Sequence, residues 1–258
     1  MDETNKKGQR QARLLGELKR RNYLSLEAIA RMFDVTIQTA RRDVMELESH
    51  GRLRRMHGGA ITIDAISPEE LRHRRTHNVG PKEQIAARVA QEIPNGAAVF
   101  LDTGTTCETI ARALVGHRGL RLLTYSLRIA AYLREATDFV IAIPGGFVRQ
   151  VDGGVFRETS HDFLQSFQFD LAVISVSGLD WTGTLADDDP AEVEIVRAAM
   201  AQSHTALLAI DGSKFGQRGL VRLGPLTDMD IVVTDHPLPD RISDQIAGAG
   251  VRYIQVGG

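Results

Sequence analysis

The sequence predicts an α/β protein in two parts: three helices with a short β-ribbon at the N-terminus, then a doubly wound, mostly parallel sheet. From residue 82 onward, short apolar runs alternate with helical segments, which is typical of a parallel sheet with helices on both faces. The net charge of the chain also differs between its N-terminal part and the remainder. Residues 1–60 contain 13 lysines and arginines against 8 aspartates and glutamates, a net charge of +5, whereas the other 198 residues carry −7. A basic first quarter indicates contact with a polyanion.

Residues 7–62 are expected to form the first domain. Three leucines recur at helical spacing in its first segment: Leu14, Leu15 and Leu18. Ser25 can cap a second helix over LEAIARMF, and Thr36 can cap a third over IQTARRDVMELESH. Two helices joined by a tight turn, here within residues 24–43, are typical of a helix-turn-helix.

The third helix is expected to stop at Gly51 and to bury one apolar stripe: Ile37, Ala40, Val44 and Leu47. The stretch RLRRMHGGAITI alternates and predicts a hairpin that turns at Gly58-Gly59.

The outer face of the third helix is polar and cationic. In a helix-turn-helix, the first turns of the second helix enter the major groove, where Gln and Arg read base edges and Thr hydroxyls hold phosphates. Arginines on the ribbon would add phosphate contacts. The alternative interpretation is the solvated face of an ordinary three-helix bundle. The candidate DNA-binding residues are Thr36, Gln38, Thr39, Arg41, Arg42, Arg52, Arg54, Arg55 and His57.

Residues 63–81 contain Pro68, Pro81 and the charged run RHRR, and are expected to be a linker with a short helical piece. Residues 82–258 are expected to form the second domain. Its candidate strands are seven apolar runs: AAVFLD, LRLLT, FVIAI, DLAVISV, TALLAID, IVVTD and VRYIQV. Near-continuous apolar runs are typical of buried parallel strands.

Residues that follow the strands form a candidate anion site, because ligands of such sheets bind beyond the carboxyl ends of the strands. Glycines and helix N-termini present N–H groups to an anion, lysine supplies charge, and aspartates can accept bonds from ligand hydroxyls. A small phosphorylated polyol would use all of these groups. Ordinary turn chemistry is the competing interpretation. Five strand ends carry such residues: Asp102 to Thr106, Thr124 to Ser126, Pro144 to Gly146, Ser177 to Asp180 and Asp211 to Lys214.

No cofactor is expected, because GTT lacks a Walker lysine and no G-x-G-x-x-G occurs. Cys107 is the single cysteine, and no histidine is placed by sequence to activate it as a nucleophile. His73 and His77 stand at i, i+4 spacing without further ligands, so no metal site is expected. The chain shows no secretory signal and no run of about 18 apolar residues, so a cytoplasmic location is expected.

The stretch FDVTIQTARRDVMELESHGRLRRMHGGA resembles the winged helix-turn-helix of the DeoR family of bacterial repressors, whose pattern is VS-x-x-TIRRDL with a wing ending in HGGA. KEQIA, LDTGTT, PGG, SGLD and DGSKFG follow in the family order, so the resemblance covers nearly the whole chain. It implies a sensor domain akin to sugar-phosphate isomerases, with phosphate bound by Asp102 to Thr106 and near Lys214.

The stretches IPNG, VRQVDGG, SFQFD and SKFG are similar to the glycerol-3-phosphate regulon branch of that family, which implies glycerol 3-phosphate as the effector. Tyr125 stands where the family usually has Asn, Arg157 where Gly is common, and ADDDPAEVE is more acidic than the family pattern. The candidate effector-binding residues are Lys82, Asp102, Gly104, Thr105, Thr106, Thr124, Ser126, Gly145, Gly146, Gly178, Asp180, Glu192 and Lys214.

The expected protein is therefore a repressor, a homodimer or tetramer, whose affinity for double-stranded operator DNA falls when a phosphorylated polyol or sugar binds. No enzymatic activity is expected. The alternative is a sugar-phosphate isomerase with an appended DNA-binding head, in which Asp180, Glu192 and Lys214 would supply acid–base chemistry. An activator is a third alternative, because the sign of regulation depends on where the operator lies relative to the promoter.

Overall fold

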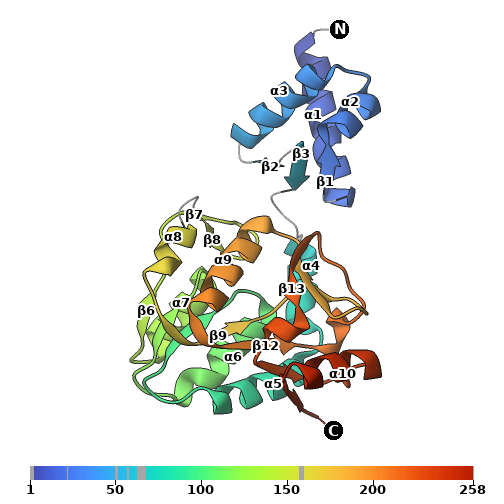
Figure 1. Ribbon diagram of the computed structural model, residues 1–258. Helices are drawn as coiled ribbons and strands as arrows, with labels where there is room; N and C mark the ends of the chain where they lie inside the picture. The colour runs from blue at the N-terminus through green and yellow to red at the C-terminus, as the bar shows by residue number, and fades with distance from the viewer. Residues whose placement is uncertain are drawn as a thin grey trace. The chain divides into compact units, whose positions relative to one another are not determined.

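The computed structural model describes residues 3–21, 23–49, 52–56, 58–62, 68–156 and 160–257. The chain separates into two compact units, Met1–Ser67 and Pro68–Gly258 (Figure 1). This division differs from the predicted linker over 63–81, of which residues 63–67 lie outside the described residues. Residues 68–81 belong to the second unit, as α4 (Pro68–Thr76) and the start of α5 (Val79–Glu92). The physical reason is that Leu71 of α4 is buried, with 4% exposure.

The first unit packs three helices against a small antiparallel sheet, as the sequence predicted. The helices are α1 (Glu3–Arg21), α2 (Leu26–Phe33) and α3 (Ile37–Ser49). The strands run in the order β1-β3-β2, namely β1 (Tyr23–Ser25), β3 (Gly59–Thr62) and β2 (Leu53–Met56). The pairing of β1 with β3 was not predicted. One hydrophobic cluster, which includes Leu14, Ile29 and Val44, joins the three helices.

Short polar contacts set the starts of the two helices in the helix-turn-helix. Ser25 Oγ accepts a hydrogen bond from the backbone N–H of Ala28 at 3.1 Å, and Thr36 Oγ1 accepts one from that of Thr39 at 3.1 Å. Between them Asp34 ends α2 in the left-handed region, with φ of 51°. Such caps replace intrahelical bonds that the first turn lacks, so the sequence prediction of both caps is confirmed.

The predicted apolar stripe of α3 is wrong at its first member. The other three residues of the stripe are buried, but Ile37 is 46% exposed because it begins the helix, one turn before the core. Asp43 is buried instead, and the Nε of Arg10 in α1 donates to its Oδ2 at 2.5 Å. This ion pair fastens α3 to α1. The predicted stop at Gly51 lies outside the described residues, and α3 ends at Ser49.

A seven-stranded, all-parallel sheet forms the centre of the second unit and confirms the seven predicted strands. Strands that neighbour each other in the sheet are often distant in the chain. The order is β15 (Arg252–Gln255), β14 (Ile231–Thr234), β12 (Ser203–Ile210), β9 (Phe169–Ile174), β4 (Ala98–Leu101), β5 (Arg121–Leu123) and β6 (Val140–Ala142).

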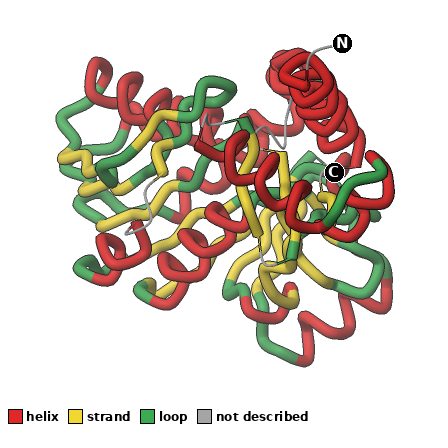
Figure 2. Tube along the Cα trace, turned by 90° about the horizontal axis from the view of Figure 1, so that it is seen from above, coloured by secondary structure: helices red, strands yellow, loops and turns green. Residues whose placement is uncertain are grey.

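Two hydrophobic layers cover the two faces of this sheet. Successive residues of a strand point to opposite faces, so Phe100 joins one layer while Val99 and Leu101 join the other. Helices supply both layers, and Figure 2 shows them outside the strands. Helices α5, α6 (Thr105–Ala113) and α7 (Leu127–Ala136) pack on one face; α8 (Ser160–Gln165), α9 (Pro190–Ala201) and α10 (Asp240–Gly248) pack on the other.

The strand order reverses between β4 and β9. From β4 the chain moves outward through β5 to β6, then returns to β9 on the other side of β4 and moves outward through β12 and β14 to β15. Loops that leave β4 and β9 therefore start at the switch point of the sheet, where ligands bind in doubly wound folds. Asp102 and Ser175 are the first residues after these two strands.

The segments between the strands of the large sheet contain short elements that the sequence did not predict. A hairpin joins β7 (Phe147–Val148) to β8 (Val155–Phe156), and an antiparallel sheet has the order β10-β11-β13. Its strands are β10 (Gly178–Leu179), β11 (Thr184–Asp187) and β13 (Val221–Pro225). Three short 3-10 helices complete the unit: Leu114–Gly116, Gly212–Lys214 and Leu226–Asp228. Among the described residues, none of the helices is both long and apolar enough to cross a membrane.

Candidate anion site and nucleic-acid interface

The loop between β4 and α6 has the geometry of an anion cradle. Gly104 precedes the first helical residue with φ of 98°, a conformation that side-chain-bearing residues rarely adopt. Thr105 and Thr106 then form the first turn of α6, where backbone N–H groups lack intrahelical partners and the helix dipole is positive. This turn can therefore bind a phosphate group with backbone and hydroxyl donors.

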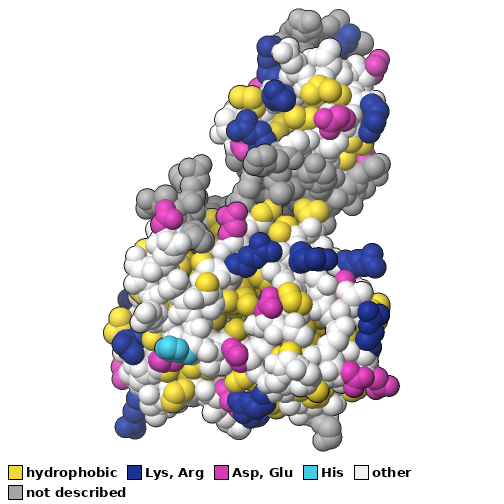
Figure 3. Space-filling model, viewed as in Figure 1, with side chains coloured by type: hydrophobic (Ala, Val, Ile, Leu, Met, Phe, Trp, Pro, Cys, Tyr) yellow, Lys and Arg dark blue, Asp and Glu magenta, His cyan; other side chains and the backbone are white. Residues whose placement is uncertain are grey.

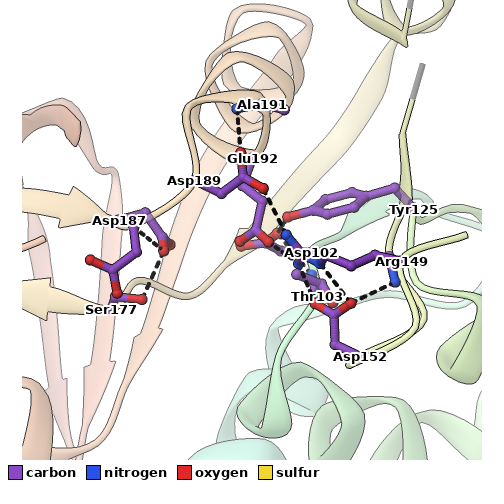
Figure 4. Close-up of polar contacts among 12 residues, drawn as sticks. Asp102, Thr103, Tyr125, Arg149, Asp152, Ser177, Asp187, Asp189, Ala191 and Glu192 are labelled. Carbon is purple, nitrogen blue, oxygen red and sulfur yellow. Dashed lines mark hydrogen bonds and ion pairs between the residues drawn. The ribbon is translucent and has the colours of Figure 1, made fainter. Parts of the chain in front are cut away.

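Asp102 lies beneath this loop and already has protein partners. Its Oδ1 accepts bonds from the backbone N–H of Thr103, at 2.8 Å, and from the Tyr125 hydroxyl; its Oδ2 accepts from the N–H of Ser175, at 3.1 Å (Figure 4). Burial raises the pKa of Asp102 to about 7, and the Tyr125 hydroxyl opposes this rise. Asp102 thus joins the ends of β4, β5 and β9, and its charge changes near neutral pH.

Lys82 and Lys214, two of the candidate effector-binding residues, lie near each other and near Arg74. Lys82 is buried, and its Nζ donates to the carbonyl oxygens of Arg74, at 2.5 Å, and His77, at 2.9 Å. Burial lowers the pKa of Lys82, while the Asp211 carboxylate opposes this change. Burial also lowers the pKa of Lys214, and the next largest cause is repulsion from Arg74. Three cations therefore share one region.

Arg74 was missed by the sequence interpretation because it lies in the predicted linker. It is a residue of α4, and its side chain pairs with Glu70 through Nη2 and Oε1 at 2.7 Å. Its charge acts on Lys82, Lys214, Asp187 and Asp188, which come from three distant parts of the chain. The run RHRR was the available signal, but it gave no indication of which arginine faces the site.

Arg149 is the centre of an acidic group that the sequence also missed. It donates to Asp152, to Asp189 from Nη1 to Oδ2 at 2.7 Å, and to Glu192 (Figure 4). Its guanidinium carbon lies 4.7 Å from the centre of the Phe156 ring. Burial would lower the pKa of Arg149, but Glu192 and Asp152 outweigh burial and raise it. Glu192 is therefore held by a protein cation.

Burial raises the pKa of two carboxyl groups in this region. Burial raises the pKa of Glu192 well above its ordinary value, against the opposing effect of Arg149. Burial also raises the pKa of Asp187, although the Ser177 hydroxyl donates to its Oδ1 at 2.7 Å. Carboxyl oxygens accept hydrogen bonds from hydroxyl groups, so this side of the site suits ligand hydroxyl groups.

Several predicted site residues have local structural contacts. Thr124 Oγ1 accepts from the N–H of Ser126 at 3.1 Å, and Ser126 Oγ caps α7 by accepting from the N–H of Ile129 at 3.3 Å. Asp180 Oδ1 accepts from both the hydroxyl and the N–H of Thr182, which closes the turn between β10 and β11.

The predicted glycines differ in what surrounds them. A Cβ atom on Gly178 would lie 2.5 Å from the carbonyl oxygen of Gln217, so close backbone contact requires glycine there. Gly145 and Gly146 follow β6 and are exposed.

The first turns of α3 present a polar and cationic surface. Thr36, Gln38, Arg41 and Arg42 are exposed and Thr39 is half-buried, while exposed Ile37 adds an apolar group beside them. Figure 3 shows Lys and Arg side chains spread over this unit.

The ribbon arginines stand as follows. Arg52 and Arg55 are exposed, and Arg55 pairs with Glu48 from Nε to Oε2 at 3.2 Å. Arg54 lies in β2, and His57 lies outside the described residues.

Comparisons with known proteins agree with both units. The family model of the DeoR-like helix-turn-helix domain matches residues 10–65, and that of the DeoR C terminal sensor domain matches residues 77–236. The chain is 37% identical over 234 residues to the Glycerol-3-phosphate regulon repressor of Escherichia coli K12, covering 91% of this chain and 93% of that one. The repressor of that name from Haemophilus influenzae is 37% identical over 229 residues, or 89% of each chain.

Other proteins are similar to the chain at lower identity. The HTH-type transcriptional repressor CsqR of Escherichia coli K12 is 31% identical over 245 residues, covering 95% of this chain and 94% of that one. Among solved structures, ribose 5-phosphate isomerase A of Methanocaldococcus jannaschii is similar at a TM-score of 0.40 and 13% identity, over 54% of this chain and 55% of that one. Since both family models match in order, and 37% identity extends over 91% of its length, the chain belongs to the DeoR family of transcriptional regulators.

Proposed function

We propose that this protein is a sequence-specific transcriptional repressor whose operator affinity falls when a phosphorylated small polyol or sugar binds its second unit. Glycerol 3-phosphate is the first candidate effector. The observation that carries the proposal is the 37% identity, over 91% of the chain, to proteins named glycerol-3-phosphate regulon repressors. Both halves of such a device are present: a helix-turn-helix and a sensor domain.

The DNA-binding role is assigned to α3 and the ribbon. Gln38, Arg41 and Arg42 would reach base edges, because they are exposed on the first turns of the second helix of the motif. Thr36, Thr39 and the ribbon arginines would hold phosphates. A homodimer or tetramer would place two such heads on an inverted repeat.

The effector role is assigned to the carboxyl ends of β4, β5, β9 and β12. The phosphate group would bind the first turn of α6, at Gly104 to Thr106, with charge from Lys214 and Lys82. The hydroxyl groups of the effector would bind on the other side, near Asp102 and Glu192, whose raised pKa values suit hydrogen bonding to neutral groups. Linkage then requires that effector and operator weaken each other's binding by the same factor.

A second candidate is an isomerase, and one observation favours it: the pKa of Asp102, at about 7, is suited to general acid–base catalysis. Glycerol 3-phosphate has no carbonyl group to isomerise, so this activity would need a sugar phosphate. Turnover of ribose 5-phosphate by the purified protein would establish it. We favour the regulator, since relatives that cover nine-tenths of the chain are named repressors.

The test is a DNA-binding titration. The full chain is titrated against a labelled duplex from the intergenic region beside its own gene, alone and with glycerol 3-phosphate, ribose 5-phosphate, glucose 6-phosphate, glycerol or inorganic phosphate. We expect tight binding that at least one phosphorylated compound weakens by about 5- to 150-fold, while glycerol does not. Equal affinity in every condition would overturn the proposal. Light scattering of the same complex gives the oligomeric state.

A further inference from the structure

The helix α4 occupies an unexpected place in the second unit. It begins at Pro68, directly after residues 63–67, and so is the first helix that follows the DNA-binding unit in the chain. Its charged sequence, PEELRHRRT, was predicted to be a short helical piece of a linker. In the structure, α4 and the corner after it contact the segments that carry the candidate phosphate site.

The first attachment joins α4 to α6. The Arg75 guanidinium donates to both carboxylate oxygens of Glu108, from Nη2 to Oε1 at 2.9 Å and from Nε to Oε2 at 3.1 Å. Glu108 is in the first turn of α6, one turn after Gly104. Paired, two-point contacts between Arg and a carboxylate are strong and directional, so a shift of the Gly104 loop should be felt by α4.

The second attachment joins the corner after α4 to the loop after β12. Asn78 adopts the left-handed conformation, with φ of 55°, and its Nδ2 donates to Oδ1 of Asp211 at 2.9 Å. Asp211 also binds the Ser213 N–H at 3.0 Å, in the 3-10 turn that ends with Lys214. The corner is thus held by the turn that carries one of the predicted phosphate ligands.

The third attachment is Lys82 itself. A lysine has three N–H donors, and two of those on Lys82 bind the carbonyl oxygens of Arg74 and His77, at the C-terminal end of α4. A cation there satisfies carbonyl groups that have no helical partner. A phosphate that recruits the Lys82 ammonium therefore competes with the end of α4.

We propose that α4 is the element that transmits effector binding to the DNA-binding unit, and that phosphate does so by drawing Lys82 away from the end of this helix. A nine-residue polar helix is unstable by itself, so α4 depends on these attachments. Losing its C-terminal contacts loosens α4, the helix with which the second unit begins at Pro68. This inference rests on the proposed function and adds the route of communication.

The test compares two variants with a matched control on the same helix. Arg75→Gln/Glu108→Gln removes the first attachment without changing net charge, and Asn78→Gly removes the second while keeping a residue that tolerates positive φ. Arg72→Gln/Glu69→Gln removes an ion pair of α4 between side chains that are 67% and 73% exposed. Operator affinity is measured with and without glycerol 3-phosphate, or the panel member that releases the wild type, and effector affinity by calorimetry.

We expect the control to keep the wild-type ratio of operator affinities without and with effector. In both test variants this ratio should fall at least about threefold. Operator affinity without effector, and effector affinity without DNA, should each stay within about threefold of the wild type, and this combination is the signature of lost coupling. In the wild type, effector should accelerate hydrogen exchange of the α4 amides at residues 72–77. This last measurement stands even if a variant fails to fold.

Two failures are distinguishable. If the wild type does not respond to any phosphorylated compound, the proposed function is overturned and this inference falls with it. If the wild type responds but both variants respond equally, or effector leaves exchange in α4 unchanged or slower, the route through α4 is overturned and the proposed function stands.

Discussion

The hydroxyl group of Tyr125 donates a hydrogen bond to Oδ1 of Asp102, and both side chains are almost completely buried. The bond links the residues that follow two adjacent strands, β4 and β5. Phe100 stacks against the Tyr125 ring, and Phe156 packs against it at a tilt, with centroids 6.2 and 5.4 Å away. An aromatic side chain therefore fills the space beside Asp102, and a ligand hydroxyl must compete with the protein for that carboxylate.

Tyr125→Phe should destabilise the second unit by about 1–3 kcal/mol, because a buried carboxylate loses one of its donors while the ring packing is kept. Urea unfolding of the wild type and the variant measures this change. Tyr132→Phe is the matched control, since Tyr132 is 41% exposed. Equal stability of the Tyr125 variant and the wild type would show that the hydrogen bond contributes nothing.

Asp102→Asn should change the pH dependence of stability. The folded state raises the pKa of Asp102 from 3.8 to about 7, so the folded protein retains a proton that the unfolded chain releases. Stability from this group is present below about pH 4 and is lost as pH rises to about 7, by at most about 4 kcal/mol. The variant lacks this loss, so its stability relative to the wild type should rise across that window. Thermal unfolding at several pH values measures the difference, and a pH-independent difference contradicts the assignment.

Arg149→Met should be strongly destabilising, by about 3–5 kcal/mol at pH 7.5, because buried carboxylates lose their cation. The loss should shrink at pH 5, because burial raises the pKa of Glu192 and protonation removes its unpaired charge, and adding Glu192→Gln should restore part of it. Urea unfolding at both pH values tests this expectation. Arg134→Met, at an exposed site on α7, should have little effect. An equal loss at both positions would argue against a special role for the group around Arg149.

Lys214→Ala and Thr105→Val should each weaken effector binding by about tenfold or more, because each removes a donor to the phosphate group. Operator affinity without effector should stay unchanged, so the variants would repress without responding. Calorimetry with glycerol 3-phosphate and anisotropy with operator DNA provide the two measurements. Arg218→Ala, an exposed cation nearby in sequence, serves as control. Unchanged effector affinity would remove these residues from the site.

Arg41→Ala and Arg42→Ala should each lower operator affinity by about tenfold, because each removes a proposed contact to a base edge. Effector affinity should not change, because these arginines lie in the other unit. Anisotropy titrations with operator DNA measure operator affinity, and calorimetry with glycerol 3-phosphate measures effector affinity. Arg118→Ala, exposed in the second unit, should bind operator like the wild type. A loss of effector affinity in the α3 variants would refute this division of roles.

Local chemistry explains why much of the fold was predictable. Ser25 and Thr36 each accept a hydrogen bond from the backbone N–H three residues later, so their capping roles can be read from the local sequence. The strands are short apolar runs, and this pattern can be recognised without knowing which strands pair. Ile37 was misplaced because a periodic pattern does not say where the core ends.

The site was only partly predictable, because its contacts join distant residues. Asp102 and Tyr125 are 23 positions apart, and Arg149 and Glu192 are 43 apart. The strand-end rule selects Asp102, Lys214 and the Gly104 loop as candidates, because each follows a single strand. It could not find Arg74 or Arg149, whose roles depend on packing between segments. It also could not show that Asp180 would be used by its own turn.

The reversal of strand order between β4 and β9 separates recognition from folding. Most candidate ligand contacts follow the carboxyl ends of the strands, whereas the two hydrophobic layers lie along the faces of the sheet. Substitutions confined to residues 103–105, none of which belongs to either layer, can therefore alter ligand specificity without reworking the interior. A combinatorial library restricted to these positions would be a practical starting point for retuning such a switch into a biosensor for another phosphorylated metabolite.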